Sequence, residues 1–182
     1  MSPTEWVKAI FNNCVLIPAT GNNIELREGS SYTIELTGLT DDAVAIKMDA
    51  FPPLGEDGSC RHCKFLSHGI HRSDYLVIDT RWDKWYAVFL ELTQSTLGGK
   101  GKSHLTEQFS GSLSVWNFIN DIKQKNIGVH FRYVAVSAIG HTVPPKRTRE
   151  RETHEHPDSF LSYYVGTKKT IHFNQLLGAN LN

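Results

Sequence analysis

The stretch "HRSDYLVIDTRWDKWYAVFLELTQS", residues 71–95, decides the fold. It contains two runs rich in β-branched and aromatic residues, 74–79 and 85–92, joined by the polar segment "TRWDK". Such residues favour β-strands, and the short polar connection predicts that the two runs pair as an antiparallel hairpin. Both runs are apolar almost throughout, which is typical of central strands covered on both faces. The sequence therefore places this hairpin in the middle of the protein.

Before the hairpin, the sequence predicts a short helix and two further strands. Trp6 and Ile10 would share one face of a helix over 3–12. "GNN" at 21–23 is typical of a turn. Apolar residues alternate over 31–36 and over 42–48, and the segment between these runs is long enough to connect them as a hairpin.

After the hairpin, the pattern changes to helical spacing. Apolar residues recur every three or four positions over 104–125, and Ser103 is the expected N-cap of this helix. A strand is predicted over 129–139, and a strand with a helical turn over 170–178. Residues 144–158 are charged without apolar periodicity, which indicates an exposed loop that includes His154 and His156.

This order of elements indicates an α/β (α+β) fold, with a mixed central β-sheet flanked by helices. The length of 182 residues fits a single domain. We divide it into an N-terminal helix and hairpin over 1–53, a core over 64–139, and a C-terminal loop and tail over 140–182.

The composition excludes several classes of protein. The chain is 40% hydrophobic and 21% charged, and 19 basic residues balance 19 acidic ones. Any nucleic-acid-binding surface must therefore be local. The N-terminus lacks a signal peptide, and no apolar run approaches the about 18 residues expected of a membrane-spanning helix. The odd number of cysteines, 3, favours a reducing compartment, so we expect a cytoplasmic protein.

Two acids mark the ends of the predicted hairpin. Asp74 opens its first strand and Glu91 closes its second, so both carboxylates should lie at the same end of the sheet. Two nearby carboxylates favour Mg²⁺, which activates water and stabilises charge on a phosphodiester. A backbone carbonyl near Leu92 would complete the protein ligands. Acids at strand ends are also common without any ligand, and this ordinary interpretation stays open.

The order of these residues resembles the PD-(D/E)xK nuclease superfamily, which has the restriction-endonuclease-like fold. Its members carry an acid on one strand, Glu-x-Lys on the next, and a following helix that often bears a functional Gln. The resemblance covers residues 64–137 and treats the early hairpin as an elaboration. It implies that Asp74 and Glu91 bind Mg²⁺ or Mn²⁺ and that Gln108, in "TEQFSGS", supports catalysis.

The sequence departs from this family at Thr93, which stands where the motif has Lys. The family Lys orients or activates the attacking water and offsets charge, which threonine cannot do electrostatically. Gln94 is one candidate to position water, although strand alternation points it away from Glu91. Alternatively a lysine from elsewhere takes the role, or the site is catalytically dead and the fold serves for binding. The candidate lysines are Lys100 and Lys102 on the adjacent loop, and Lys47 and Lys64 on neighbouring segments.

A separate cluster of cysteines and histidines precedes the hairpin. Its four candidate ligands for a structural Zn²⁺ are Cys60, Cys63, His68 and His71. Zinc favours tetrahedral sulfur and nitrogen ligands, and Cys-x₂-Cys is half of many zinc knuckles. The spacing excludes a Cys₂His₂ finger with its own helix. A loop with coincidental histidines and reduced thiols is the alternative.

Three basic segments are candidate nucleic-acid contacts. Lysine and backbone N–H groups of "GGKGKSH" would grip phosphate, "PPKRTRER" adds four basic residues to one acid, and one arginine precedes the first acid of the hairpin. A solvated loop remains the simpler interpretation of "PPKRTRER". The candidate residues are Arg72, Lys100, Lys102, Lys146 and Arg147.

Three functions are consistent with these patterns. The first is a metal-dependent nuclease that acts on DNA or RNA, and we expect it to work with a protein partner. By resemblance it would belong to a bacterial or mobile-element defence system. The second is a catalytically degenerate nuclease-fold subunit that binds nucleic acid or protein. The third is a zinc-stabilised interaction module, for which the acids are incidental.

Overall fold

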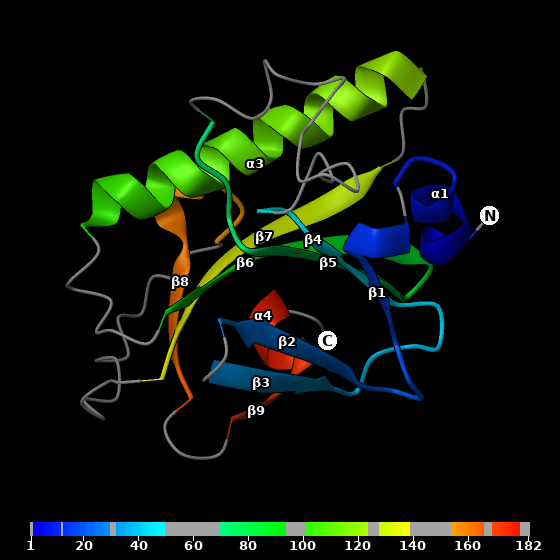
Figure 1. Cartoon of the computed structure of the whole chain (residues 1–182), viewed down its shortest axis with the longest axis horizontal. Coiled ribbons are helices and arrows are strands. Elements are labelled where there is room, and N and C mark those ends of the chain that lie inside the picture. The colour runs from blue at the N-terminus through cyan, green and yellow to red at the C-terminus, as the bar shows by residue number, and fades with distance from the viewer. Residues whose placement is uncertain are drawn as a thin grey trace.

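A six-stranded mixed β-sheet lies at the centre of the protein (Figure 1). The structure is a computed structural model that describes residues 2–11, 13–29, 32–49, 70–93, 101–123, 128–138, 154–165 and 169–178. The strand order is β1-β4-β5-β6-β7-β8. From β1 to β6 the neighbours are antiparallel, whereas β6, β7 and β8 run parallel. The strands are β1 (Leu16–Pro18), β4 (Val44–Lys47), β5 (Tyr75–Arg81), β6 (Lys84–Thr93), β7 (Val129–Ser137) and β8 (Leu161–Tyr164).

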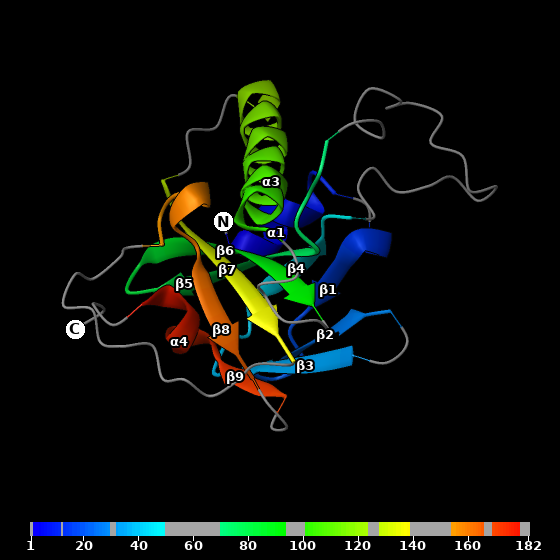
Figure 2. The ribbon, with the colours of Figure 1, turned by 90° about the vertical axis from the view of Figure 1, so that its left-hand side faces the viewer.

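Each face of this sheet is covered by a different layer (Figure 2). Helices α1 (Pro3–Lys8) and α3 (Lys102–Lys123) pack on one face. The other face meets a small three-stranded sheet together with α4 (Phe173–Leu177). The predicted α/β class with a mixed sheet flanked by helices is therefore confirmed. Two short 3₁₀ helices, η1 (Asn13–Val15) and η2 (Pro157–Ser159), complete the described elements.

The central hairpin forms as the sequence predicts. β5 pairs with β6 over seven residue pairs, from Tyr75 opposite Leu90 to Arg81 opposite Lys84. Every residue from Tyr75 to Asp79 is buried, as is every residue from Tyr86 to Thr93. The near-continuous apolar pattern is thus explained by burial on both faces.

The loop of this hairpin is shorter than the five-residue segment "TRWDK" that the sequence predicted. Only Trp82 and Asp83 lie between the strands, and their φ angles are +48° and +59°. Positive φ at both central positions is the hallmark of a type I′ turn, whose twist matches that of the flanking strands. Neither residue is the glycine or asparagine that this turn prefers, so the turn holds backbone strain.

Helix α3 confirms the predicted long helix but begins earlier. The carbonyl of Gly101 accepts hydrogen bonds from the N–H groups of His104 and Leu105, so Ser103 lies inside the first turn. The prediction of Ser103 as N-cap is therefore wrong. The buried stripe follows the predicted spacing and consists of Leu105, Gln108, Phe109, Ser112, Val115, Trp116 and Ile119. Within the described ranges, no helix is long and apolar enough to cross a membrane.

The early hairpin that the sequence predicts does not form. The strands over 31–36 and 42–48 exist, but they belong to different sheets. β3 (Tyr32–Thr37) pairs with the unpredicted β2 (Ile24–Glu28), while β4 pairs with β1 and β5. The physical reason is that β4 is buried on both faces, as a strand next to the central hairpin must be, whereas β3 alternates and needs only one covered face.

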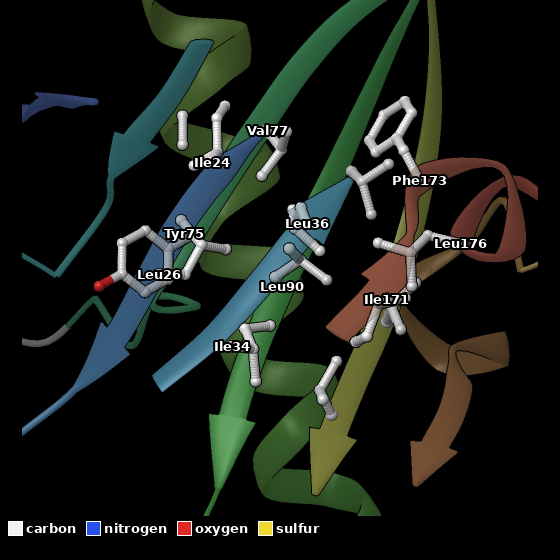
Figure 3. Packing of buried hydrophobic residues seen from close by; sticks show 14 of the residues in the cluster. Ile24, Leu26, Ile34, Leu36, Tyr75, Val77, Leu90, Ile171, Phe173 and Leu176 are labelled. Atoms are coloured by element: carbon white, nitrogen blue, oxygen red, sulfur yellow. The ribbon is translucent and has the colours of Figure 1, made fainter. Parts of the chain in front are cut away.

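The small sheet packs its apolar face against the large one. It consists of β2, β3 and β9 (Thr170–His172), with β9 parallel to β3. The apolar side chains of both sheets and of α4 interdigitate in one cluster (Figure 3). The labelled residues are Ile24, Leu26, Ile34, Leu36, Tyr75, Val77, Leu90, Ile171, Phe173 and Leu176. The predicted strand and helical turn over 170–178 are confirmed as β9 and α4.

A buried charge pair ties the two sheets together. Asp79 of β5 is fully buried, and its Oδ2 lies 2.7 Å from Arg81 Nη2. Its Oδ1 accepts a hydrogen bond from the backbone N–H of Thr40, at 3.2 Å, in the segment that connects β3 to β4. Arg81 also donates to the carbonyl of Gly38 and lies over the ring of Phe173. Removal of either charge would leave its partner buried without compensation, which is strongly destabilising.

The C-terminal segment corrects one further expectation. His154 is buried, not exposed, and its Nε2 lies 2.7 Å from the carbonyl oxygen of Leu176. Arg132 of β7 donates from Nε to the carbonyl of Leu177 at 2.9 Å. Both side chains therefore satisfy carbonyls at the end of α4, where the helix itself supplies no donors. His156 is exposed, as expected.

The strained β5–β6 turn yields a prediction about stability. Replacing Trp82 and Asp83 with Asn and Gly should raise the free energy of unfolding by about 1 kcal/mol, because Asn-Gly is the preferred type I′ pair. The loss of packing should be small, since Trp82 is 55% exposed. Urea denaturation measures the change.

The matched control is Asp83→Val, because a β-branched residue is strained at positive φ. This variant should unfold at a lower urea concentration than the wild type. Equal midpoints for all three proteins would contradict the assigned turn.

Candidate functional site

The two predicted acids lie opposite each other at one end of the central hairpin. Tyr75 pairs with Leu90, so the same antiparallel register places Asp74 opposite Glu91. Side chains directly opposite on neighbouring strands have Cβ atoms about 4.5–5.5 Å apart. Residues of the same parity, Leu76 on β5 and Phe89 on β6, pack in the cluster that includes α3. Both carboxylates therefore project from the helix-covered face of the sheet.

Asp74 is held firmly although it immediately precedes β5. Its Oδ2 accepts a hydrogen bond from the backbone N–H of Leu92 at 2.7 Å, and its carbonyl accepts one from Met48 N at 2.8 Å. The neighbouring Ser73 is fully buried and bonds through its N–H to Ser112 Oγ at 2.8 Å. Asp74 is thus held by the residue that follows β4, by β6 and, through Ser73, by α3. It is half-buried, which leaves part of its carboxylate near solvent.

Glu91 lies deeper, beneath α3. It is 1% exposed, and its Oε1 accepts a hydrogen bond from Gln108 Nε2 at 2.9 Å. The same Gln108 nitrogen lies 3.3 Å from the carbonyl oxygen of Arg72. Two acceptors around Nε2 define the orientation of the amide. The three residues that the family resemblance selected, Asp74, Glu91 and Gln108, are therefore gathered at one place.

The amide oxygen of Gln108 is the unusual atom of this group. It is buried and has no hydrogen-bond partner within the ranges that the structure describes. A buried acceptor without a donor costs about 1–3 kcal/mol, and such atoms often mark a site for a water or an ion. The oxygens here, from two carboxylates and an amide, are the ligand type that Mg²⁺ prefers. The site therefore fits a hard divalent cation with bound water.

Helix α3 approaches this site unusually closely at Gly111. A Cβ atom at that position would stand 1.9 Å from the carbonyl oxygen of His71 and 3.0 Å from Ile70 Cγ2. Only glycine allows the helix to lie directly on the segment that leads into Asp74. The contact sets the height of α3 above the sheet, and so the distance from Gln108 to Glu91.

Thr93 occupies a buried position on the same face as Glu91, two residues further along β6. It is 2% exposed, and its backbone carbonyl accepts a hydrogen bond from Ala138. The site therefore has a neutral hydroxyl where the family has an ammonium group.

The structure places two of the four lysines proposed as substitutes. Lys47 stands two residues after Ala45 on β4, so the two side chains point to the same face of the sheet. Ala45 packs in the cluster on the face opposite the helices, and Lys47 is therefore directed away from Glu91. Lys102 is exposed at the first residue of α3, and no hydrogen bond or ion pair joins it to Asp74 or Glu91 within the described part of the chain. Lys64 and Lys100 lie outside the described residues, as does Gln94.

Arg72 is the described cation nearest to the acids in sequence. It is half-buried. Burial lowers the pKa of its guanidinium from the usual value, and the nearby carboxylate of Asp49 opposes this shift. Arginine stays protonated in proteins despite such shifts. The backbone carbonyl of Arg72, two residues before Asp74, accepts a hydrogen bond from Gln108.

Of the four predicted zinc ligands, only His71 lies among the described residues. Cys60, Cys63 and His68 lie outside the described residues, as do Lys146 and Arg147 of the basic loop. No group of three or more metal-ligating side chains occurs among the residues that are described.

His71, the fourth predicted zinc ligand, is exposed and meets a residue that the sequence did not single out. Its ring centroid lies 5.5 Å from that of His104, in the first turns of α3. Only the tertiary fold brings these two histidines together.

No protein-family profile, no curated protein and no solved structure matches this chain.

The close approach at Gly111 gives a prediction with an unusual sign. Gly→Ala within a helix normally stabilises by about 1 kcal/mol through helix propensity. Gly111→Ala should instead destabilise by about 2 kcal/mol, because the new methyl group overpacks against the backbone of His71. Thermal and urea denaturation measure the difference.

Gly128→Ala is the matched control, since a Cβ at Gly128 would meet nothing within 4 Å. It should leave stability within about 0.5 kcal/mol of the wild type. A stabilising Gly111→Ala would show that α3 does not rest on residues 70–71.

Proposed function

We propose that this protein is a metal-dependent nuclease that hydrolyses phosphodiester bonds of DNA or RNA. The observation that carries the proposal is the convergence of Asp74, Glu91 and Gln108 at one end of the helix-covered face of the sheet. These residues come from β6, from the position before β5 and from α3. Two acids at strand ends would not by themselves bring a glutamine from a helix to the same place.

The acids would hold the cation, and the amide would orient them. Asp74 and Glu91 are the protein ligands for Mg²⁺ or Mn²⁺, with bound waters completing the shell. When bound, the cation activates water and stabilises charge on the phosphodiester. Gln108 Nε2 donates a hydrogen bond to Oε1 of Glu91 and so orients this carboxylate. The amide oxygen of Gln108 could accept a hydrogen bond from a water.

Arg72 supports this role through its charge. Its guanidinium remains cationic and offers planar, forked donors that suit phosphate oxygens. It stands two residues before Asp74, and its backbone is fixed by Gln108. Arg72 would offset the charge that the motif Lys offsets elsewhere. It cannot replace a lysine as a proton carrier, because its pKa stays far above neutrality.

The order of elements is also similar to the PD-(D/E)xK pattern. Three antiparallel strands, β4, β5 and β6, are followed by α3 and then by β7 parallel to β6. The acids fall on β6 and immediately before β5, and the glutamine falls on α3. This agreement supports a restriction-endonuclease-like core as part of the proposal. A role in antiviral or mobile-element defence, with a protein partner, extends the same resemblance.

A second candidate is a catalytically degenerate member that binds nucleic acid or protein. The specific observation in its favour is that the position of the motif lysine is occupied by Thr93, which is buried on the same face as Glu91 and carries no charge. Of the proposed replacements, Lys47 faces away and Lys102 is exposed. Under this candidate the acids and Gln108 persist as a buried polar cluster that fixes α3 on the sheet.

Metal binding and cleavage test the first candidate together. Titration of Mn²⁺ into the protein, followed by calorimetry, should show one site that Asp74→Asn and Glu91→Gln each weaken at least tenfold. The same variants should lose cleavage of plasmid, single-stranded DNA or RNA in Mg²⁺ or Mn²⁺. Both substitutions keep the shape of the side chain and remove only its charge.

Glu107→Gln is the control, because Glu107 is exposed on α3 beside Gln108. It should bind Mn²⁺ and cleave as the wild type does. Metal binding without cleavage would favour the degenerate candidate, and a folded protein that neither binds metal nor cleaves would refute the nuclease proposal.

Thr93→Lys distinguishes the two candidates more directly. A lysine at this position would point to the face that carries Glu91 and would restore the motif. If the site retains its metal and lacks only this group, cleavage should rise about 100-fold or more, the lower range of general acid–base catalysis. The double variant Glu91→Gln, Thr93→Lys should stay inactive. Unchanged cleavage by a folded, metal-binding Thr93→Lys protein would show that a missing lysine is not what limits the site.

A further inference from the structure

Two histidines far apart in sequence meet at the start of helix α3. His71 precedes the central hairpin and is exposed, and His104 is half-buried in the first turns of α3. Their ring centroids lie 5.5 Å apart, with the ring planes at 69°. Neither belongs to the acid pair, although both are close to it in sequence: His104 stands one helical turn before Gln108, and His71 stands three residues before Asp74.

The backbone of each histidine is fixed independently. His104 is part of a helix, and its N–H donates to the carbonyl of Gly101 at 3.0 Å. The carbonyl of His71 rests against Gly111, and the next two residues are bonded to α3, Arg72 to Gln108 and Ser73 to Ser112. The pair is therefore presented by a rigid scaffold, which lowers the entropic cost of binding a ligand between the rings.

The spacing of the rings matches that of two imidazoles on one metal ion. A Zn–N bond is about 2.0–2.1 Å, and the ring centroid lies about 1.1 Å beyond the nitrogen, so each centroid is about 3.2 Å from the metal. At the tetrahedral angle, two such centroids are about 5.2 Å apart. The observed separation is 5.5 Å. Rotation about the Cβ–Cγ bond leaves each centroid nearly in place, so both nitrogens can turn toward one ion at little cost.

We infer that His71 and His104 form a binding site for a divalent transition-metal ion such as Zn²⁺, Ni²⁺ or Co²⁺. Imidazole nitrogen suits these ions, whereas Mg²⁺ prefers oxygen ligands. Water or a substrate group fills the remaining coordination positions, as in an open site. The site does not require the proposed nuclease activity. In this site the second metal ligand beside His71 is His104 on α3, and not the cysteines and the histidine that precede His71 in the sequence.

A bound ion at this pair would place positive charge beside the acid pair. It would also link the segment that precedes β5 to α3, in addition to the contact at Gly111. The two metal sites differ in ligand chemistry, so each can be titrated with an ion that the other binds poorly.

The test uses the full chain and Ni²⁺ as the probe, followed by calorimetry. His71→Ala and His104→Ala should each weaken Ni²⁺ binding at least tenfold, and Mn²⁺ binding at the acid pair should stay unchanged. His130→Ala is the control, because His130 is an exposed histidine that stacks on Tyr86 elsewhere. It should bind Ni²⁺ as the wild type does.

The variant Cys60→Ser, Cys63→Ser removes the competing thiols. Ni²⁺ binding that survives in this variant and is lost in His104→Ala supports the inference. Binding that is lost in the cysteine variant and retained in His104→Ala would overturn it, because the ion would then belong to the upstream cluster. A wild-type protein that binds no Ni²⁺ would overturn it as well, and would leave the Mg²⁺ or Mn²⁺ proposal untouched.

Discussion

The register of the β5–β6 hairpin is the constraint on which the rest of the structure depends. A shift of one residue would exchange the two faces of every side chain in both strands, and both faces are buried. One face packs against α1 and α3 and the other against the small sheet, so neither cluster tolerates the exchange. The same register places Asp74 opposite Glu91. The geometry of the candidate site is thus set by apolar packing, not by the polar residues themselves.

The polar site then depends on how closely α3 approaches the sheet. Glu91 is almost fully buried, and a buried carboxylate is costly unless hydrogen bonds compensate it. Gln108 supplies one such bond only because Gly111 lets the helix rest on the backbone of His71. Ser112 adds a second attachment through Ser73. One helical turn therefore carries the glycine, the amide and the hydroxyl that together place α3 on the segment before β5.

The opposite face of the central sheet is covered by a layer that contains a small sheet and only one short helix, α4. β2 and β3 form a hairpin, and β9 from the C-terminal part of the chain pairs with β3 in parallel. The Asp79–Arg81 pair and its bonds to Thr40 and Gly38 anchor the segment between β3 and β4 to the central hairpin. A buried pair of this kind adds little net stability, but its specific geometry discriminates against other arrangements of the layers. Asp79, a further acid of the hairpin, therefore serves the packing of the two layers.

The sequence by itself determined the elements whose patterns are local. The central hairpin, helix α3, strand β7 and the C-terminal strand and helix follow from composition and periodicity, because continuous burial and helical spacing leave a direct trace in the residues. The placement of Asp74 and Glu91 at one end of the sheet followed from the predicted hairpin, whereas Gln108 was selected by the resemblance to the PD-(D/E)xK superfamily. Sheet membership was decided only by the tertiary structure: β3 and β4 are neighbours in sequence, yet each pairs with other strands. Long-range pairing, the buried state of His154 and the meeting of His71 with His104 depend on contacts between distant segments, and no local pattern records which segments will meet.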